Sequence, residues 1–472
     1  MRLYILTYKY MLHLTPIIID RGVFMRITRK QIAVIAFLNV VIILLVLFIV
    51  FGKPGALGAT DDTPQDDPSV GGDDSQTVIA PPVPEHNKLR KASAGLVDEI
   101  VTETRLMGSG DETIVYAQTI GGVLYVFGNT TVADFDFDSY GGFVCRFNSA
   151  LDILGFTYLD GKITAVCMIG DGFAVGTYSA TDTGDSKSRL YAVDLDGGAK
   201  TVVTPSGEVA DITVDEGVIA VLTKQSSNGF TLTEYSTDGD KWNAEYSTRI
   251  SSSYTLDYFD CYKIGRVYVL AARAYSLPRY DSLVFYTFEA GGDPSAHFYG
   301  GTGDSLMQPY AVLPYPSGYI ALCRREGTAV IVTVDYAFKT YRRETLGFAF
   351  ERARLFYNDG LYYACLDCAD GPITYEIDAN LNLRPLGVAD GMAVLNVADG
   401  TAVKLIGTAG DKLRIAATSG ANTVDLAMNA EKCRAVKTQD GGLVLVVSSS
   451  GGDAVSAPTG GRDIYVLLMR NS

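Results

Sequence analysis

The sequence predicts an all-β protein whose main part, residues 97–472, is a single β-propeller of about eight four-stranded blades, with seven blades as the alternative. The first observation is a series of glycines that end short apolar runs about 40–50 residues apart, which is the period of a propeller blade. These glycines are Gly122, Gly172, Gly217, Gly265, Gly318, Gly360, Gly400 and Gly442. Several of them lie in Asp-Gly or similar turns, where glycine supplies the positive φ that a two-residue hairpin requires.

A second marker runs in phase with the glycines. Each expected third strand ends in an apolar residue followed by a turn-forming residue, as in Phe147-Asn148, Val193-Asp194, Tyr235-Ser236, Phe288-Glu289, Val334-Asp335 and Ile377-Asp378. The runs between the markers are rich in Val, Ile, Leu and Tyr, a composition typical of strands. Because isolated sheets of this size are only marginally stable, the blades are expected to stack and bury both faces.

The two ends of the repeat region predict how the ring closes. The last unit stops after its third strand, 463–469, whereas residues 97–106 read as a strand that precedes Gly108-Ser109-Gly110-Asp111. A similar tetrad, Gly301-Thr302-Gly303-Asp304, follows the fourth strand of another blade. We therefore expect 97–106 to pair with the carboxy-terminal blade as its fourth strand and to leave no open edge.

Two stretches resemble the repeat of bacterial surface and secreted propellers of the SBBP type. The residues that carry the resemblance are Thr438, Asp440-Gly441-Gly442, Val444-Leu445-Val446, Ser448-Ser449, Gly460-Gly461 and Asp463-Ile464-Tyr465-Val466, and in a second copy Tyr125-Val126, Gly128, Thr130, Asp134-Phe135 and Gly141-Gly142-Phe143-Val144. The resemblance implies a propeller fold and an extracytoplasmic setting. It implies no catalytic residues, because that family shares none.

One turn is similar to the Asp-box of sialidase-like propellers, although it is one residue shorter than the usual spacing. It consists of Ser236-Thr237-Asp238-Gly239-Asp240-Lys241-Trp242 and falls between an expected third and fourth strand. The serine and aspartate side chains of such a turn bond to nearby backbone groups. The turn is therefore expected to cap a hairpin and to take no part in chemistry.

Residues 32–52 predict a single transmembrane helix, because Asn39 is the only polar side chain in a run long enough to cross a bilayer. Arg26, Arg29 and Lys30 precede the run and only Lys53 follows it, so residues 1–31 are expected in the cytoplasm and the propeller outside the cell membrane. A cleavable signal peptide is the alternative. No cysteine follows the run directly, which excludes a lipoprotein anchor. Met25 is an alternative start, which would leave residues 1–24 untranslated.

Residues 53–96 are rich in Asp, Pro, Gly and Ser and offer too little apolar surface to fold, so they predict a disordered tether. The whole chain has 39 basic and 54 acidic residues and a net charge of -15. That balance disfavours nucleic acid and anionic lipid as partners.

The chain has few residues that could support catalysis by histidine or cysteine. There are three histidines, and His297 stands beside two aromatic residues, where packing is the expected role. Cys365 and Cys368 have the spacing of a redox motif, but in a strand successive side chains point to opposite faces, so they are expected to be structural. A Ser-His-Asp site or a histidine-ligated metal centre is therefore disfavoured.

The longest loops are expected between second and third strands and between blades, and both kinds open on one face, here called the loop face. Loops with a rigid support often carry function, which predicts a binding site on this face. The candidate binding residues are Tyr178, Arg273, Tyr275, Arg279, Tyr280 and Asp304. One such loop also carries carboxylates at alternate positions, the oxygen-rich spacing of a calcium loop, with a solvated edge as the alternative. They are Asp134, Asp136 and Asp138.

The function predicted from these patterns is a membrane-tethered, monomeric binding or scaffolding module for a protein or glycan partner. Ca²⁺ is the only cofactor that the sequence suggests. The alternative is a carboxylate-dependent glycan hydrolase or lyase on the same propeller, because two carboxyl groups suffice for glycoside hydrolysis. An accessory subunit of a larger membrane complex is a third reading.

Overall fold

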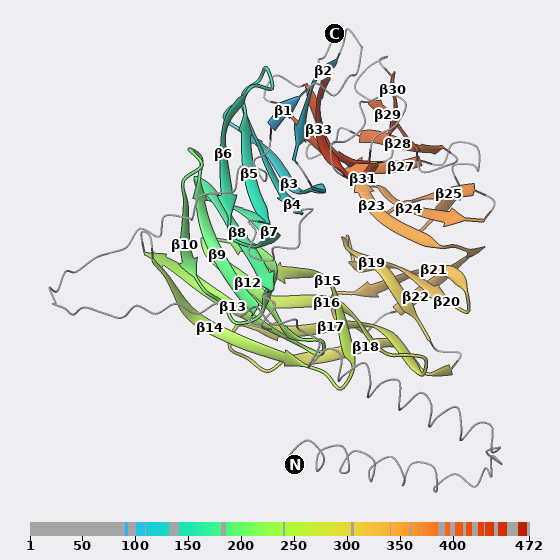
Figure 1. The fold of residues 1–472 in the computed structure, drawn as a ribbon. Helices are drawn as coiled ribbons and strands as arrows, with labels where there is room; N and C mark the ends of the chain where they lie inside the picture. The colour runs from blue at the N-terminus through green and yellow to red at the C-terminus, as the bar shows by residue number, and fades with distance from the viewer. Residues whose placement is uncertain are drawn as a thin grey trace, which may run out of the picture. The chain divides into compact units, whose positions relative to one another are not determined.

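A computed structural model of the chain is all-β in the part that it describes (Figure 1). The described residues are 90–92, 101–108, 110–131, 141–180, 186–238, 241–303, 306–339, 341–358, 361–369, 371–385, 392–396, 402–408, 412–417, 423–428, 430–438, 442–450 and 461–469. Among these residues no helix is long and apolar enough to span a bilayer. The predicted transmembrane helix at 32–52 lies outside them, as does the tether as far as residue 89.

The strands form eight antiparallel sheets, seven with four strands and one with five, numbered here as blades 1 to 8 in chain order. Blades 1 and 2 consist of β3 (Glu112–Ile120), β4 (Val123–Thr130), β5 (Gly142–Phe147) and β6 (Ile153–Leu159), then β7 (Lys162–Ile169), β8 (Gly172–Ala180), β9 (Ser186–Asp194) and β10 (Ala199–Val203). Blades 3 and 4 consist of β11 (Glu208–Asp215), β12 (Val218–Ser226), β13 (Gly229–Asp238) and β14 (Lys241–Ser251), then β15 (Thr255–Ile264), β16 (Val267–Ser276), β17 (Tyr280–Glu289) and β18 (Ser295–Gly301).

The second half of the chain repeats this pattern. Blades 5 and 6 consist of β19 (Gln308–Tyr315), β20 (Gly318–Arg325), β21 (Thr328–Asp335) and β22 (Tyr341–Ala349), then β23 (Arg352–Asn358), β24 (Leu361–Cys368), β25 (Gly371–Ile377) and β26 (Leu383–Pro385). Blades 7 and 8 consist of β27 (Met392–Asn396), β28 (Ala402–Thr408), β29 (Lys412–Ala417) and β30 (Thr423–Met428), then β31 (Ala430–Lys437), β32 (Leu443–Ser449), β33 (Asp463–Met469), β2 (Val101–Met107) and β1 (Arg90–Ala92).

The first strands of the blades form a closed cycle of contacts. Each one contacts the first strand of the next blade, from β3 through β7, β11, β15, β19, β23 and β27 to β31, and β31 contacts β3 again. The fourth strands β14 and β22 are exposed along most of their length, which puts them at the outer edges. A cycle of sheets with first strands inside and fourth strands outside is a β-propeller. It has eight blades, the larger of the two numbers predicted.

Blade 8 joins the two ends of the described chain. Strand β2 pairs with β33, with Val101 opposite Met469 and Arg105 opposite Tyr465. Residues 101–106 of the predicted closing strand therefore pair as expected, and residues 97–100 lie outside the described part of the chain. The prediction of four strands and of a tether as far as residue 96 was wrong here. Residues Arg90–Ala92 form β1 on the outer edge of β2, where backbone groups would otherwise be unpaired.

The marker glycines that the structure describes occupy the hairpins between first and second strands, as predicted, whereas Gly360 and Gly400 lie outside the described residues. Gly122, Gly217 and Gly265 have φ values of 80°, 83° and 60°, in the left-handed region that favours glycine. Gly172 and Gly318 are the first residues of β8 and β20. This hairpin side of the propeller, opposite the loop face, is called the hairpin face below.

The hydrophobic cores lie between successive blades. One core joins blades 8 and 1 through residues such as Val446, Ile464, Ile114 and Phe143. The corresponding cores join blades 1 and 2, 2 and 3, 3 and 4, 4 and 5, and 5 and 6. Blades 1 to 5 therefore bury both of their faces against neighbouring blades, which fixes their first strands around the centre.

Candidate functional site

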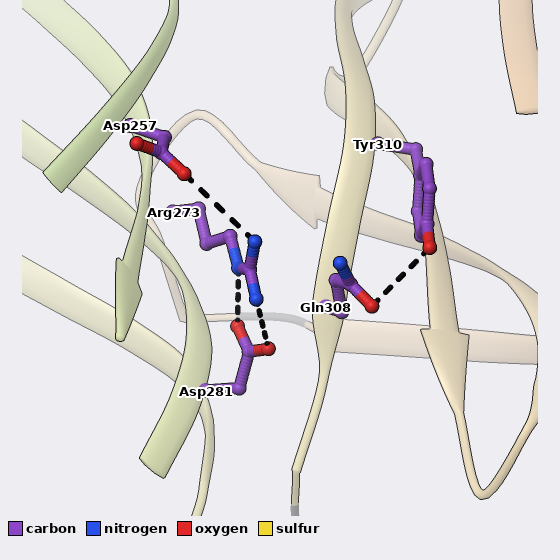
Figure 2. Close-up of polar contacts among 5 residues, drawn as sticks. All are labelled: Asp257, Arg273, Asp281, Gln308 and Tyr310. Atoms are coloured by element: carbon purple, nitrogen blue, oxygen red, sulfur yellow. Dashed lines mark hydrogen bonds and ion pairs between the residues drawn. The ribbon is translucent and has the colours of Figure 1, made fainter. Parts of the chain in front are cut away.

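The predicted loop-face site of blade 4 is built around Arg273, near the end of β16 (Figure 2). Its Nε and Nη2 atoms donate to Oδ1 and Oδ2 of Asp281 at 2.8 and 2.7 Å, a bidentate pair. Its Nη1 atom lies 3.8 Å from Oδ2 of Asp257, on the first strand β15. Arg273 and Asp281 are 14% and 7% exposed. Arg273 thus links three strands of blade 4 through these contacts, and its N–H groups are directed toward Asp281 and Asp257.

One aromatic ring covers the arginine, and a stacked pair of tyrosines lies at the same end of the blade, on its other face. The guanidinium lies over the ring of Tyr275 at 4.4 Å, and the ring of Tyr280 stacks on Tyr254 with centroids 3.9 Å apart. Between β16 and β17 the chain turns outward, where Leu277 is 62% exposed and Arg279 is also exposed. The predicted residues of blade 4 therefore divide into a fixed support, Arg273, Tyr275 and Tyr280, and an exposed loop tip.

Figure 2 also shows the neighbouring first strand, β19. The Tyr310 hydroxyl donates to Oε1 of Gln308 at 3.2 Å, and the guanidinium of Arg324 lies 5.1 Å from the Tyr310 ring. These side chains were not predicted. They belong to the next blade and extend the polar surface of the loop face beyond the Arg273 group.

A second polar group lies at the loop-face end of the junction between blades 8 and 1. Glu112 is fully buried and accepts hydrogen bonds from the Thr130 hydroxyl at 2.8 Å and the Gly108 amide at 3.2 Å. Burial, with added repulsion from the carboxylate of Asp463, raises the pKa of Glu112 to about 8. The side chain of Asp463 lies 3.4 Å from Nη1 of Arg105 on the closing strand. This group joins the closure strand to both blades.

Two aspartates occupy equivalent places on neighbouring first strands. The pairing of β11 and of β15 is interrupted just before Asp211 and Asp260, where one residue bulges out of register. Each carboxylate accepts the next backbone amide, at 2.8 and 2.9 Å, and Tyr258 donates to Asp211. Burial raises the pKa of both carboxyls, that of Asp260 to about 6. Their evident role is to satisfy amides that the bulges free.

A cavity of about 370 Å³ opens at the other ends of the first strands, on the hairpin face. It lies where β11, β15 and β19 end, in blades 3 to 5. Three tyrosines, a lysine and an aspartate line it together with smaller side chains. The lining residues are Thr213, Val214, Asp215, Cys261, Tyr262, Lys263, Ile264, Pro314, Tyr319 and Tyr336. Sequence reasoning missed this site because it placed function on the face with the long loops.

The remaining predicted site residues do not join these groups. Tyr178 is half-buried on β8, opposite Ser188, and so belongs to blade 2. Asp304 and the calcium candidates Asp134, Asp136 and Asp138 lie outside the described residues. Within the part of the chain that the structure describes, no group of three or more His, Cys, Asp or Glu side chains is placed to hold a metal ion.

The residues expected to be structural are found in packing or turn positions. His297 stacks on Phe338 with ring centroids 4.5 Å apart, and burial lowers its pKa. Cys365 and Cys368 lie on β24 and are half-buried. In the turn similar to an Asp-box, Ser236 donates to Oε1 of Glu245 across the β13–β14 hairpin at 2.5 Å.

The chain is a β-propeller module by the arrangement of its sheets. No family model matches it, and no curated protein matches it. Among solved structures it is similar to BamB from Moraxella catarrhalis, with 12% identity and a TM-score of 0.44 over 77% of this chain and 97% of that chain. It is also similar to the β-propeller domain of the Trilobed protease from Pyrococcus furiosus, with 11% identity and a TM-score of 0.41 over 66% of this chain and 96% of that chain.

Proposed function

We propose that this chain is a membrane-tethered, extracytoplasmic binding or scaffolding module that docks a protein or glycan partner on its loop face. The observation that carries the proposal is the exposed tip of the β16–β17 loop above the Arg273 support. Leu277, which is 62% exposed, stands two residues before the exposed Arg279, so the tip combines apolar surface with a charged donor, and arginine is one of the residue types that most often dominate interface energies. The bidentate pair with Asp281 holds the base of the loop, which lowers the ordering cost of binding.

The tether in this proposal comes from the apolar run at 32–52 and the acidic segment that follows it. The resemblance to SBBP-type repeats supports the same orientation, in which the propeller lies outside the cell. An exposed leucine favours a protein over a glycan as the partner, since glycans present few apolar groups.

The hydrolase or lyase alternative would require two available carboxyl groups. The neighbouring first strands β11 and β15 offer two carboxyls with a raised pKa, Asp211 and Asp260, but each already accepts the amide that its bulge frees. This use by the backbone favours binding over catalysis as the role of the module.

The test combines location and docking in intact cells that express the full chain. Protease added from outside should cleave the tether between residues 61 and 89, and photo-crosslinking from position 279 should capture a defined partner. Leu277→Ser should weaken that crosslink severalfold, whereas Leu154→Ser, at a leucine on β6 of blade 1 that is 50% exposed, should not. A protected tether, or equal crosslinking in the two variants, would overturn the proposal.

A further inference from the structure

Two buried acids meet where the ring closes. Glu112, the first residue of β3, and Asp463, the first residue of β33, are both 0% exposed. Their carboxyl groups lie within hydrogen-bonding reach of each other, and Nη1 of Arg105 lies 3.4 Å from Oδ2 of Asp463. The nearby Tyr465 hydroxyl is uncharged, because burial raises its pKa. One arginine offsets one buried carboxylate, so the two carboxyl groups have to share a proton.

The other charged groups around this pair do not supply a second counter-ion for Glu112. Asp111 and Arg462 lie beside it as a partly exposed ion pair, with Nη2 of the arginine 3.4 Å from Oδ2 of the aspartate. On the closing strand β2, the other charged side chain is that of Glu103, which stands opposite the residue four positions beyond Asp463. A proton on Glu112 is therefore the available means of reducing the negative charge at this place.

Glu112 also holds the end of the closing strand. Its Oε2 atom accepts a hydrogen bond from the amide of Gly108, the residue that follows β2, at 3.2 Å. Its Oε1 atom accepts from the Thr130 hydroxyl, at the end of β4, at 2.8 Å. One carboxyl group thus contacts β4, β33 and the end of β2, so its charge affects the point at which the two ends of the propeller meet.

Strand pairing alone holds β2 in its blade (Figure 1). In blades 1 to 7 the four strands follow one another along the chain, whereas β2 precedes blade 1 and pairs with β33 from the other end. Leu106 of β2 is 0% exposed and fills the core between blades 8 and 1. Opening at this point separates one strand pair and exposes part of one core, a smaller change than unfolding of the whole ring.

We propose that the Glu112–Asp463 pair is a proton-dependent latch, in which loss of the shared proton releases β2 from β33 while blades 2 to 6 stay folded. Two ionised carboxylates repel each other inside the protein, and in the open state both reach water. A released β2 leaves the edge of β33 without its partner strand, and such an edge can pair with a strand of another protein. The latch depends neither on the proposed docking loop nor on the membrane tether.

The test is hydrogen exchange of the full-length chain in detergent, measured by mass spectrometry from pH 5 to 9. Results are expressed as protection factors, which removes the intrinsic effect of pH on exchange. In the open state Glu112 regains its ordinary pKa of 4.5, in place of about 8 in the closed state. Protection of β2 and β33 should therefore fall as the pH rises, by up to about tenfold per pH unit, and level off above about pH 8. Protection of β16 and β20, in blades 4 and 5, should show no such trend.

Two variants assign the effect to Glu112. Glu112→Gln keeps the size of the side chain but cannot ionise, so the protection of β2 and β33 should lose its pH dependence. Asp260→Asn is the matched control, because burial also raises the pKa of Asp260, to about 6, but this residue lies on β15 in blade 4. The control variant should keep the pH dependence of the unmodified chain at β2 and β33.

Three results would overturn the latch. The first is that protection of β2 and β33 in the unmodified chain does not change with pH. The second is an equal loss of protection in β16 and β20, which would mean that the whole ring unfolds. The third is that Glu112→Gln keeps the pH dependence. The first two results come from the unmodified chain, so they decide the proposal even where the variant does not fold. None of the three bears on the loop-face crosslink.

Discussion

Blades 4 and 8 each place an Asp–Arg pair at the loop-face end of the third strand, and the two pairs differ in the burial of the second acid that lies beside them. In blade 4, Asp281 on β17 bonds to Arg273, which stands on the second strand opposite Leu283. In blade 8, Asp463 on β33 pairs with Arg105, which stands on the fourth strand opposite Tyr465. Both arginines therefore reach diagonally by two residues along the third strand.

The surroundings of the two pairs are not alike. Asp463 is completely buried, and the buried carboxyl of Glu112 from blade 1 lies against it. The other carboxylate near Arg273 is that of Asp257, which is 46% exposed. In the closure, two acidic side chains and one arginine are therefore buried together. In blade 4 the second acidic side chain, Asp257, is exposed to solvent. We infer that the first group stabilises the closure and that the second supports a surface loop.

The largest expected effect comes from removing the arginine of each pair. Arg105→Met leaves a buried carboxylate without its partner and should cost about 3–5 kcal/mol of unfolding free energy. Arg273→Met leaves the Asp281 carboxylate, which is also buried but has no second buried acid beside it, and should cost about 1–3 kcal/mol. Urea unfolding of the full chain measures both, with Arg266→Met, an exposed arginine of the β15–β16 hairpin, as the control. Equal losses for the two variants would show that burial does not distinguish the blades.

A smaller effect concerns pH at the closure. The folded-state pKa of Glu112, about 8, lies above its ordinary value of 4.5, so between these values the folded state binds more protons than the unfolded state. Stability should therefore be greatest at low pH and fall as the pH rises toward 8, by at most roughly 1.4 kcal/mol per pH unit. Glu112→Gln removes the titration, and urea unfolding at pH 5, 6, 7 and 8 should show a flatter profile. If the unfolding free energy of Glu112→Gln depended on pH as steeply as that of the unmodified chain, a group other than Glu112 would be responsible for the dependence.

The periodic part of this architecture could be predicted because it rests on local chemistry. Glycines with positive φ, such as Gly217 and Gly265, are typical of hairpins and can be recognised in the sequence. A last blade that lacks a fourth strand of its own needs that strand from the other end of the propeller sequence. The close approach of Glu112 to Asp463 could not be predicted, because the two residues lie at opposite ends of the propeller sequence. The strand β1 was missed because its short sequence resembles the polar tether around it.

The cavity could not be predicted for a related reason. Its walls come from the ends of three first strands in three blades, and tyrosines in such strands read as core residues. Tyr262 and Tyr336 do make ordinary bonds to the backbone. Only the packed structure shows that the hydroxyl of Tyr319, a residue of the same type in the same cluster, is left without a partner.

The smallest expected effect tests whether Asp257 belongs to the blade 4 support. Its carboxylate lies 3.8 Å from Arg273 and is 46% exposed, so water and salt screen the attraction, and Asp257→Asn should cost under about 1 kcal/mol. Asp281→Asn should cost more, because it weakens a buried bidentate pair. A double-mutant cycle of each aspartate with Arg273→Met, at low and high salt, separates the two couplings. If the Asp257 coupling equalled that of Asp281, blade 4 would hold a three-membered charge group like that of the closure, and burial would no longer explain why the two blades differ.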